Sequence, residues 1–337
     1  MTPASISVVI ITYNEEKNIR PCLDSLMALD YPKEKHEILV VDASTDETPR
    51  IVQSYEMVRL IRSAKGFSQQ KNAGLEAAKF DIVAFTDADC IIPPDWLRVI
   101  DRAFREEKVT GVGGNAFPPP AIHRFGLWTA CVGHPAGGAI GFDANVERGR
   151  DGVAFVAGCN SAFRKSALLE VGGFDPRFSD GGEDVDVSRR LKDRGFFLDY
   201  IPELTVYHKA RDTLKAYLRW NIGVGITKYN LHRPSLGSLI FQPFFPLWPC
   251  LLAVGCVVLL FHSFLLSIGL WLFLWFSFLG VLGLATRPFP LLLKRRNKIG
   301  VHLLSCLTII PVLILLRQIC INAGQLKKWA RLKRLKP

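Results

Sequence analysis

The segment Ile82–Asp89 reads IVAFTDAD and joins a run of strand-forming residues to two carboxylates. Ile82–Thr86 has the continuous apolar and β-branched character of a strand that is covered on both faces. Asp87 and Asp89 follow it directly, and two carboxylates one residue apart can hold a hard divalent cation through oxygen ligands. Aspartates with this spacing often arise by chance, so the prediction of a metal site depends on their place at the end of a strand.

Three further strand-like runs precede this segment, with helix-like runs between them. The strands are predicted at Ile6–Thr12, Glu37–Val41 and Val58–Ile61, and the helices at Ile19–Met27 and Lys71–Ala78. Strands and helices that alternate with short connections are typical of parallel strands joined by right-handed crossovers. We therefore expect an α/β domain with a mostly parallel sheet, whose strands end at one common edge. Open sheets of this kind bind ligands at that edge.

Polar side chains follow the predicted strands where they reach that edge. Tyr13, Asn14 and Glu15 end the first strand, Asp42 ends the second and Asp87 the fourth. Any one of them alone could be an ordinary loop residue or a helix cap. Together they favour a nucleotide site, because Tyr13 can stack on a base and the carboxylates can accept its hydrogen bonds. The sequence has no GxxxxGK[ST] or GxGxxG run, so a glycine loop is not expected to hold the phosphates.

A second group of carboxylates lies in the later half of the domain. Asp180–Asp184 reads DGGED and precedes a predicted helix at Val185–Arg194. Glu183 and Asp184 could simply complement the helix dipole. The two glycines also let a substrate come close, and a carboxylate there can remove a proton from an attacking hydroxyl.

The regions around this motif are predicted with less detail. Phe155–Asn160 is predicted as a strand, and Ser161–Gly173 as a turn and a helix. His208 follows the strand-like Leu204–Tyr207, and a lone histidine is more often structural than a metal ligand. The stretch Gly111–Gly152 is rich in glycine, proline and aromatic residues, and we interpret it as a mobile or membrane-facing acceptor loop.

The charge of the chain divides sharply at Asp212. Of the 42 Lys and Arg residues, 26 lie at or before Asp212 together with all 31 acidic residues, whereas the remaining 125 residues carry 16 basic and no acidic side chains. This composition excludes a disordered tail protein and a small disulfide-stabilised module. A basic, apolar tail also fits a membrane better than nucleic acid, so we expect no nucleic-acid partner.

The tail has enough apolar residues to cross a membrane more than once. Between Arg233 and Arg287, 53 consecutive residues carry no formal charge apart from His262. As a helix they would extend about 80 Å, more than twice the ~30 Å of a bilayer core. We predict spans at about 241–261 and 264–285, and a third membrane-embedded helix at about 299–321.

The orientation follows from the basic loops, because positive residues favour the cytoplasm. Two crossings place the catalytic domain and the loop after the second span inside. The third segment contains Pro311, and whether it crosses or re-enters with both ends inside stays open. Met1–Ser7 lacks the pattern of a cleavable signal, so we expect a multi-pass protein of the cytoplasmic (inner) membrane with its catalytic domain in the cytoplasm. The domain boundaries that we predict are 1–212 for the catalytic domain, 213–237 for an interfacial amphipathic linker, 238–322 for the membrane helices and 323–337 for a basic tail.

The eight cysteines contain no CxxC pair, and half of them lie in the apolar tail. In a reducing cytosol we interpret them as small core or lipid-facing residues, not as disulfides or metal ligands.

Six motifs in this order resemble a family 2 glycosyltransferase with the GT-A fold. They are Ser7–Glu15 (SVVIITYNE), Glu37–Asp46 (EILVVDASTD), Lys71–Gly74 (KNAG), Asp87–Asp89 (DAD), Gly158–Asp175 (GCNSAFRKSALLEVGGFD) and Gly182–Asp184 (GED). The resemblance extends from about Ser5 to His208. It implies a Rossmann-like GT-A domain that uses a nucleotide sugar, followed here by C-terminal transmembrane helices.

The resemblance also implies a role for each matching residue. Asp87 and Asp89 would hold Mn²⁺ or Mg²⁺, with His208 as a further ligand. Asp184, with Glu183 beside it, would be the general base of an inverting transfer. The nucleotide sugar would contact Tyr13, Asn14, Glu15, Asp42, Lys71, Asn72 and Asp87.

Two departures from the family narrow the expected reaction. The processive synthases of the family carry QxxRW, whereas Ala216–Trp220 reads AYLRW, so we disfavour a processive polysaccharide synthase. Family members that glycosylate a polyprenyl phosphate use a phosphate as nucleophile and need no base, so the GGED motif favours a hydroxyl acceptor.

We therefore expect a membrane-bound, metal-dependent, inverting and non-processive glycosyltransferase in the synthesis of a cell-envelope glycan. Its donor would be a nucleotide sugar, with UDP favoured, and its acceptor a hydroxyl of a lipid or lipid-linked saccharide. Two alternatives stay open: a polyprenyl-phosphate glycosyltransferase, and a catalytically silent membrane scaffold with the same fold.

Overall fold

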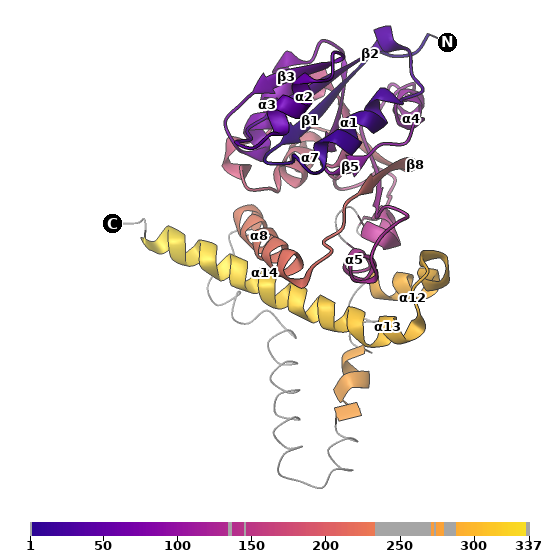
Figure 1. Cartoon of the computed structure of the whole chain (residues 1–337), viewed down its shortest axis with the longest axis vertical. Coiled ribbons are helices and arrows are strands. Elements are labelled where there is room, and N and C mark those ends of the chain that lie inside the picture. Colours follow the sequence, from indigo (N-terminus) through magenta and orange to yellow (C-terminus); the bar gives the residue numbers. More distant parts are fainter. Residues whose placement is uncertain are drawn as a thin grey trace. The chain divides into compact units, whose positions relative to one another are not determined.

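The computed structural model describes residues 2–133, 137–144, 146–232, 271–272, 274–279 and 288–334 (Figure 1). The chain divides into two compact units, Met1–Ala210 and Arg211–Pro337.

The first unit is built on one eight-stranded sheet with the strand order β3-β2-β1-β4-β7-β6-β8-β5. The strands are β1 (Ile6–Thr12), β2 (His36–Asp42), β3 (Val58–Arg62), β4 (Ile82–Asp87), β5 (Cys90–Ile91), β6 (Val109–Phe117), β7 (Asn160–Arg164) and β8 (Phe197–His208). The helices are α1 (Ile19–Met27), α2 (Thr48–Gln53), α3 (Phe67–Ala77), α4 (Trp96–Ala103), α5 (Arg124–Ala130), α6 (Lys165–Glu170) and α7 (Glu183–Asp193). Short 3₁₀ turns occur at Lys33–Lys35, Gly138–Ile140, Phe142–Ala144 and Pro176–Phe178.

The first four strands are parallel, as the sequence predicts. Every residue of β1 is buried, because helices pack over both faces of this half of the sheet (Figure 1). The register pairs Thr12 of β1 with Asp42 of β2, and Ile11 of β1 with Asp87 of β4. The parallel register therefore brings the ends of three strands to one edge.

The expected boundary between strand and helix near Asn160 is wrong. The strand is β7, which begins at Asn160 and pairs antiparallel with β4 through Thr86↔Asn160. The helix α6 starts only at Lys165. Nothing local in Ser161–Phe163 indicates this, because the segment becomes a strand by pairing with β4 on one side and β6 on the other.

The expectation that Gly111–Gly152 forms a loop from its start is also wrong, because β6 runs to Phe117. Its glycines are needed for close packing inside the sheet. A Cβ at Gly111 would lie 2.7 Å from Leu198 and from Phe163, and one at Gly114 would lie 1.7 Å from the Leu204 carbonyl oxygen. Glycines in a strand can mark such close approaches as well as loops.

The second unit contains α8 (Leu214–His232), α12 (Pro288–Ile299), α13 (Leu303–Leu307) and α14 (Ile309–Arg334). Pro311 lies in the first turn of α14, where its missing N–H and fixed φ are tolerated, so the helix breaks at Thr308 instead. The helix continues through the predicted basic tail to Arg334.

One helical segment of the described residues, Leu303–Lys333, is long and apolar enough to cross a membrane. It overlaps the third predicted segment. The first predicted span, 241–261, lies outside the described residues. Of the second, 264–285, only 271–272 and 274–279 are described, and they are helical.

Two glycines let α8 and α14 approach each other closely. A Cβ at Gly225 would lie 2.1 Å from the Ile321 carbonyl oxygen, and one at Gly324 would lie 2.1 Å from the Ile222 carbonyl oxygen. The hydroxyl of Tyr217 donates to the Leu313 carbonyl at 2.9 Å. Small residues at a helix crossing are a common device of membrane helices, which lack hydrophobic drive for association.

Gly225→Val is therefore expected to destabilise the second unit by about 1–3 kcal/mol, the usual cost of overpacking a close contact. The measurement is a thermal melt of the full-length protein in detergent. Gly223→Ala is the matched control, because a Cβ at Gly223 meets no atom within 4 Å. Equal melting temperatures for the two variants would show that the crossing does not contribute to stability.

Candidate active site

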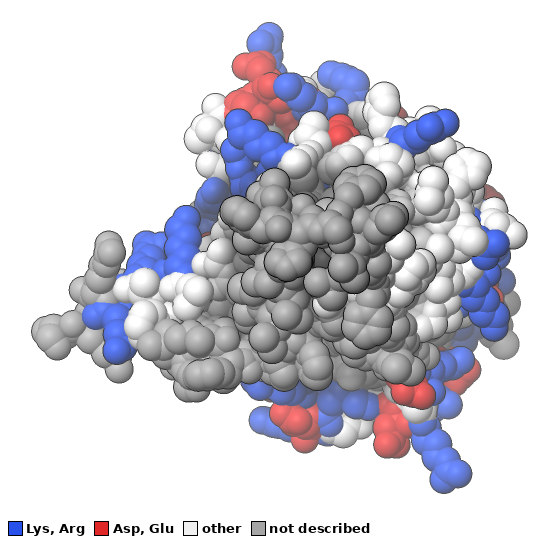
Figure 2. All heavy atoms as spheres, turned by 90° about the horizontal axis from the view of Figure 1, so that it is seen from below, with Lys and Arg blue, Asp and Glu red and all other residues white. Residues whose placement is uncertain are grey.

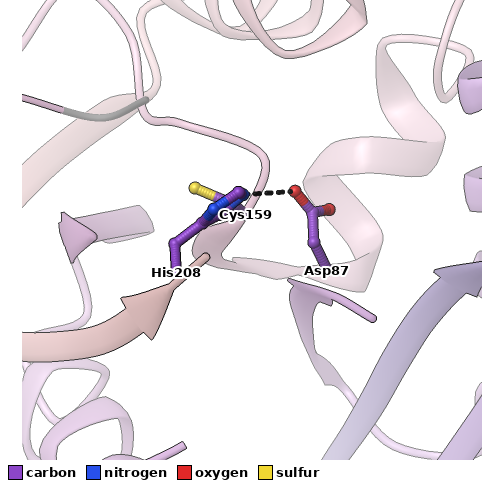
Figure 3. A group of neighbouring side chains, drawn as sticks. All are labelled: Asp87, Cys159 and His208. Atoms are coloured by element: carbon purple, nitrogen blue, oxygen red, sulfur yellow. Dashed lines mark ion pairs between the residues drawn. The ribbon is translucent and has the colours of Figure 1, made fainter. Parts of the chain in front are cut away.

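The end of β4 and the end of β8 meet at the Asp87–Asp89 segment. The short strand β5 follows Asp89 and pairs antiparallel with β8, placing Cys90 opposite His208. The Nε2 atom of His208 lies 3.5 Å from Asp87 Oδ2 (Figure 3). It also lies 3.4 Å from Asp89 Oδ1. The three residues predicted as metal ligands are thus brought together by strand pairing that sequence reasoning did not foresee.

The chemistry of this group suits a divalent cation. His208 Nδ1 lies 3.0 Å from the Lys209 carbonyl oxygen, and a proton on Nδ1 leaves the Nε2 lone pair facing both carboxylates. A hydrogen bond from the second ring nitrogen to a carbonyl is the usual way in which proteins orient a metal-binding histidine. Two carboxylate oxygens and one imidazole nitrogen then converge, so these residues fit a metal of the Mn²⁺ or Mg²⁺ kind.

Tyr13 and Asn14 directly follow the end of β1, which pairs with β4, the strand that ends at Asp87. The ring of Tyr13 is 40% exposed and Lys65 Nζ lies 3.5 Å from its centroid. Asn14 has a left-handed backbone with φ of 57°, and its side-chain oxygen accepts a hydrogen bond from Thr45 N at 2.9 Å. An exposed ring beside a cation can stack on a base, and Lys65 is a candidate binding residue that sequence reasoning missed.

Glu15 is held at the start of the loop before α1. Its backbone N–H donates to Thr48 Oγ1 at 2.9 Å, and its carboxylate accepts from Asn18 Nδ2 at 2.6 Å. Glu15 is half-buried, whereas Tyr13 and Asn14 are exposed.

Asp42 lies at the predicted edge but is completely buried. Its carboxylate accepts hydrogen bonds from Thr12 Oγ1 at 2.9 Å and from Ser44 N at 3.1 Å, and it forms an ion pair with Arg62. In this arrangement Asp42 joins the ends of β1, β2 and β3.

Lys71 and Glu183 form a buried ion pair that the sequence does not reveal. Lys71 Nζ lies 2.6 Å from Glu183 Oε1, and the two side chains are 3% and 6% exposed. Burial would lower the pKa of Lys71, but Glu183, Asp184 and Asp87 together raise it above its ordinary value. Burial raises the pKa of Glu183, and Lys71 offsets this in part. The pair joins α3 to the first turn of α7.

Asn72, the neighbour of Lys71 on α3, makes a second link to the later half of the domain. Its amide nitrogen donates to the Phe174 carbonyl at 2.7 Å, and its amide oxygen accepts from Phe174 N at 2.8 Å. The structure therefore shows Asn72 clamping the segment before α7.

Asp184 lies beside this pair but is more open. It is half-buried, and its carboxylate accepts from Gly158 N at 3.0 Å and Val185 N at 2.8 Å. A Cβ at Gly158 would lie 2.4 Å from Lys71 Nζ, so only glycine lets this backbone reach the carboxylate. The two adjacent acids are thus separated by environment, Glu183 inward and Asp184 at the accessible side.

Cys159 is close to Asp87, since its sulfur lies within 4.8 Å of a carboxylate oxygen of that residue. Burial raises the pKa of this thiol, and Asp87, Asp184 and Asp89 raise it further. Asp87 and Asp184 also act on Lys71. Gly158 N donates to Asp184 at 3.0 Å, and the sulfur of the next residue, Cys159, lies within 4.8 Å of donor atoms of Asp87 and His208, so Asp184 and the Asp87–Asp89–His208 group both lie next to this short segment.

Comparison with known protein families gives a match over most of the chain. A family described as "Glycosyltransferase like family 2" matches residues 3–222. The match spans every residue that forms the site, from Tyr13 to His208.

Two archaeal relatives and one solved structure are also similar. Glycosyltransferase AglE of Haloferax volcanii is 30% identical over 247 residues, covering 68% of this chain and 76% of the relative. A dolichyl N-acetyl-alpha-D-glucosaminyl phosphate 3-beta-D-2,3-diacetamido-2,3-dideoxy-beta-D-glucuronosyltransferase of Methanococcus voltae is 25% identical over 277 residues, covering 78% and 85%. The mannosyltransferase PcManGT of Pyrobaculum calidifontis, solved with GDP-Man and Mn²⁺, has a TM-score of 0.57 at 18% identity and covers 97% and 89%. This last likeness concerns the fold.

Proposed function

The chain belongs to glycosyltransferase-like family 2, and on that premise we propose that it transfers a sugar from a nucleotide sugar, with inversion, to a hydroxyl of a lipid or lipid-linked acceptor. One observation carries the proposal. Asp184, the more accessible of two adjacent acids, accepts a hydrogen bond from Gly158 N at 3.0 Å, and the next residue, Cys159, has its sulfur within 4.8 Å of donor atoms of Asp87 and His208. The proposed base, Asp184, is therefore close to the group that would bind the departing diphosphate through a cation.

The nucleotide binds at the open edge formed by the ends of β1 and β2. Tyr13 stacks on the base with Lys65 beside the ring, and Asn14 and Glu15 border the same edge. Asp42 and Asn72 act as positioning residues, since their side chains are engaged within the protein. UDP is the favoured nucleotide.

The acceptor hydroxyl is activated by Asp184. Its carboxylate is fixed by Gly158 N and Val185 N and takes the hydroxyl proton as the new bond to the anomeric carbon forms. The bond from that carbon to the diphosphate breaks on the opposite face, and its electron pair leaves with the nucleoside diphosphate. Lys71 and Glu183 hold the first turn of α7 in place and so position the base.

Asp87, Asp89 and His208 would hold the cation, Mn²⁺ or Mg²⁺. When bound there, a divalent ion would neutralise charge on the diphosphate leaving group. The protein's own contribution is the orientation of His208 by the Lys209 carbonyl.

The acceptor is proposed to be lipid-linked. The name of the Methanococcus voltae relative specifies a dolichyl N-acetylglucosaminyl phosphate. In this chain the catalytic unit is followed by a second unit in which the only acidic residue is Asp212, near its start, which suits a membrane surface with anionic headgroups.

The helix α14 supports membrane association of the second unit. Val312, Ile319 and Leu326 are exposed on one face at seven-residue intervals. Four basic side chains lie near the end of this helix: Lys327, Lys328, Arg331 and Lys333. Figure 2 shows Lys and Arg in blue on the face of the molecule seen from below. Apolar residues followed by basic residues favour association of the helix with a membrane, with the basic end of the helix on the cytoplasmic side. We propose a multi-pass protein of the cytoplasmic membrane.

The first test is release of nucleoside diphosphate from a panel of UDP-, GDP- and dTDP-sugars by detergent-purified protein with Mn²⁺ and lipid extract. Asp89→Ala is expected to weaken Mn²⁺ binding by more than about tenfold, because it removes a carboxylate from the cation site. Activity at low Mn²⁺ should fall with it and recover in part when Mn²⁺ is raised.

The matched control is Asp81→Ala. Asp81 is exposed and directly precedes β4, whereas Asp89 follows the other end of that strand. The Mn²⁺ affinity and activity of this control variant should equal those of the wild type. Equal Mn²⁺ affinity in Asp89→Ala would remove this residue from the cation site, and absence of turnover with every donor would favour the silent scaffold.

A further inference from the structure

Two buried thiols, Cys159 and Cys90, lie close to the group formed by Asp87, Asp89 and His208. Asp87, Cys159 and His208 form one group whose ligand atoms all lie within 4.8 Å of one another (Figure 3). Asp89, Cys90 and His208 form a second group of the same kind. The sequence-based interpretation of the cysteines as core residues does not foresee this, because Cys159 and His208 are far apart in the chain and meet only through the sheet.

The spacing of the other donors suits a small tetrahedral cation. A metal about 2.1 Å from two ligands at a tetrahedral angle separates them by about 3.4 Å. His208 Nε2 lies 3.5 Å from Asp87 Oδ2. The sulfur of Cys159 lies within 4.8 Å of a ring nitrogen of His208 and of a carboxylate oxygen of Asp87, and so supplies the third donor of the group.

The combination of nitrogen, carboxylate oxygen and sulfur has a clear metal preference. Mg²⁺ and Mn²⁺ favour oxygen ligands, whereas Zn²⁺ and Co²⁺ bind thiolate and imidazole strongly. Coordination of the metal by Cys159 forms a bond between sulfur and the metal and releases the thiol proton to solvent. No oxidant or reductant is needed.

Cys159 is the better placed of the two thiols. Asp87, in its group, is 31% exposed and gives an ion a path from solvent, whereas Asp89, in the Cys90 group, is 12% exposed. Asn160 fixes the backbone next to Cys159, because its amide nitrogen donates to the Asn115 and Leu204 carbonyls at 2.8 and 2.9 Å. Its amide oxygen accepts from Trp96 Nε1 at 2.9 Å.

We propose that Asp87, Cys159 and His208 form a thiolate-containing site for Zn²⁺ that competes with the hard cation of the transferase for Asp87 and His208. The transferase is then sensitive to zinc through Cys159. The thiolate site stands on the donor atoms alone, whereas its competition with the hard cation rests on the proposed function.

The test is titration of the full-length, detergent-purified, reduced protein with Co²⁺, which reports a bound thiolate by a sulfur-to-cobalt charge-transfer band. We expect the band in the wild type, its loss on addition of Zn²⁺, and its absence in Cys159→Ser. Zn²⁺ affinity should fall at least tenfold in that variant, while Mn²⁺ affinity, measured by electron paramagnetic resonance, should change less than about twofold.

Cys90→Ser is the matched control and should retain the band. No band in the wild type, or a band that persists in Cys159→Ser, would overturn the proposal, and so would a band lost only in Cys90→Ser. A parallel fall in Zn²⁺ and Mn²⁺ affinity would show a merely structural role for Cys159. If Cys159→Ser does not fold, the wild-type band and its displacement by Zn²⁺ still decide whether a thiolate binds the metal. None of these results bears on sugar transfer, which the donor panel tests separately.

Discussion

Replacing Asp184 with Asn is expected to lower kcat by about 10²–10⁴-fold, the range over which a positioned general base accelerates a reaction. An amide of the same shape cannot take the proton of the acceptor hydroxyl. Donor binding should change little, because in the proposed reaction Asp184 acts on the acceptor while the nucleotide binds at the ends of β1 and β2. The measurement is kcat with saturating donor and lipid acceptor, together with the dissociation constant of the nucleotide sugar.

The matched control for this prediction is Asp193→Asn, at the exposed far end of the same helix, α7. It should leave kcat unchanged. If Asp184→Asn also keeps full activity, the nucleophile needs no base, and the polyprenyl-phosphate alternative replaces the hydroxyl acceptor.

Lys71→Met is expected to destabilise the first unit by about 3–5 kcal/mol, because it leaves the Glu183 carboxylate buried without its partner. For a unit of this size the melting temperature should fall by on the order of 10 °C. Thermal unfolding of the full-length protein in detergent provides the measurement. Activity should fall as well, since the pair holds the turn that carries Asp184.

Two further variants distinguish pairing from simple loss of packing. The double variant Lys71→Met/Glu183→Leu removes both charges and should recover much of the lost stability, since apolar pairs often replace buried ion pairs without penalty. Arg50→Met breaks the exposed pair with Glu47 and should have no measurable effect. A double variant as unstable as the sum of the two single variants would show that the ions do not act as a pair.

The half of the fold that sequence could predict is the half in which local pattern and tertiary environment agree. β1, β2 and β4 are apolar runs buried on both faces, and their ends carry Tyr13, Asp42 and Asp87 as expected. For parallel strands, knowing where each strand ends is enough to know which residues share an edge.

The second half departs from prediction because its contacts are not local. β6 contains glycines, which in the sequence are typical of a loop. The folded chain shows why they are required there: Leu198, Phe163 and Leu204 pack so closely against them that a Cβ would clash. β5 has two residues and exists by pairing with β8, yet this pairing places His208 opposite Cys90 and so brings its ring within 3.5 Å of Asp87 and 3.4 Å of Asp89. No sequence window contains both partners.

The same limit applies to the site. Spacing predicts that Glu183 and Asp184 lie together, but not that Lys71, 112 residues from Glu183, selects one of them for burial. The resemblance assigns Asp42 and Asn72 to the nucleotide, which stays a prediction, and it does not indicate their partners within the protein, Arg62 and Phe174. Cys159 is visible as a residue of a motif, and its closeness to Asp87 and His208 follows only from the folded chain.

The structure of the lipid product tests the proposed reaction most directly. Full-length protein should be incubated with the donor that the panel identifies and with lipid acceptor, and the product examined by nuclear magnetic resonance and mass spectrometry. We expect a glycosidic bond to a hydroxyl oxygen, with the anomeric configuration opposite to that of the donor. A product with retained configuration, or a sugar joined to the oxygen of a phosphate, would contradict an inverting transfer to a hydroxyl.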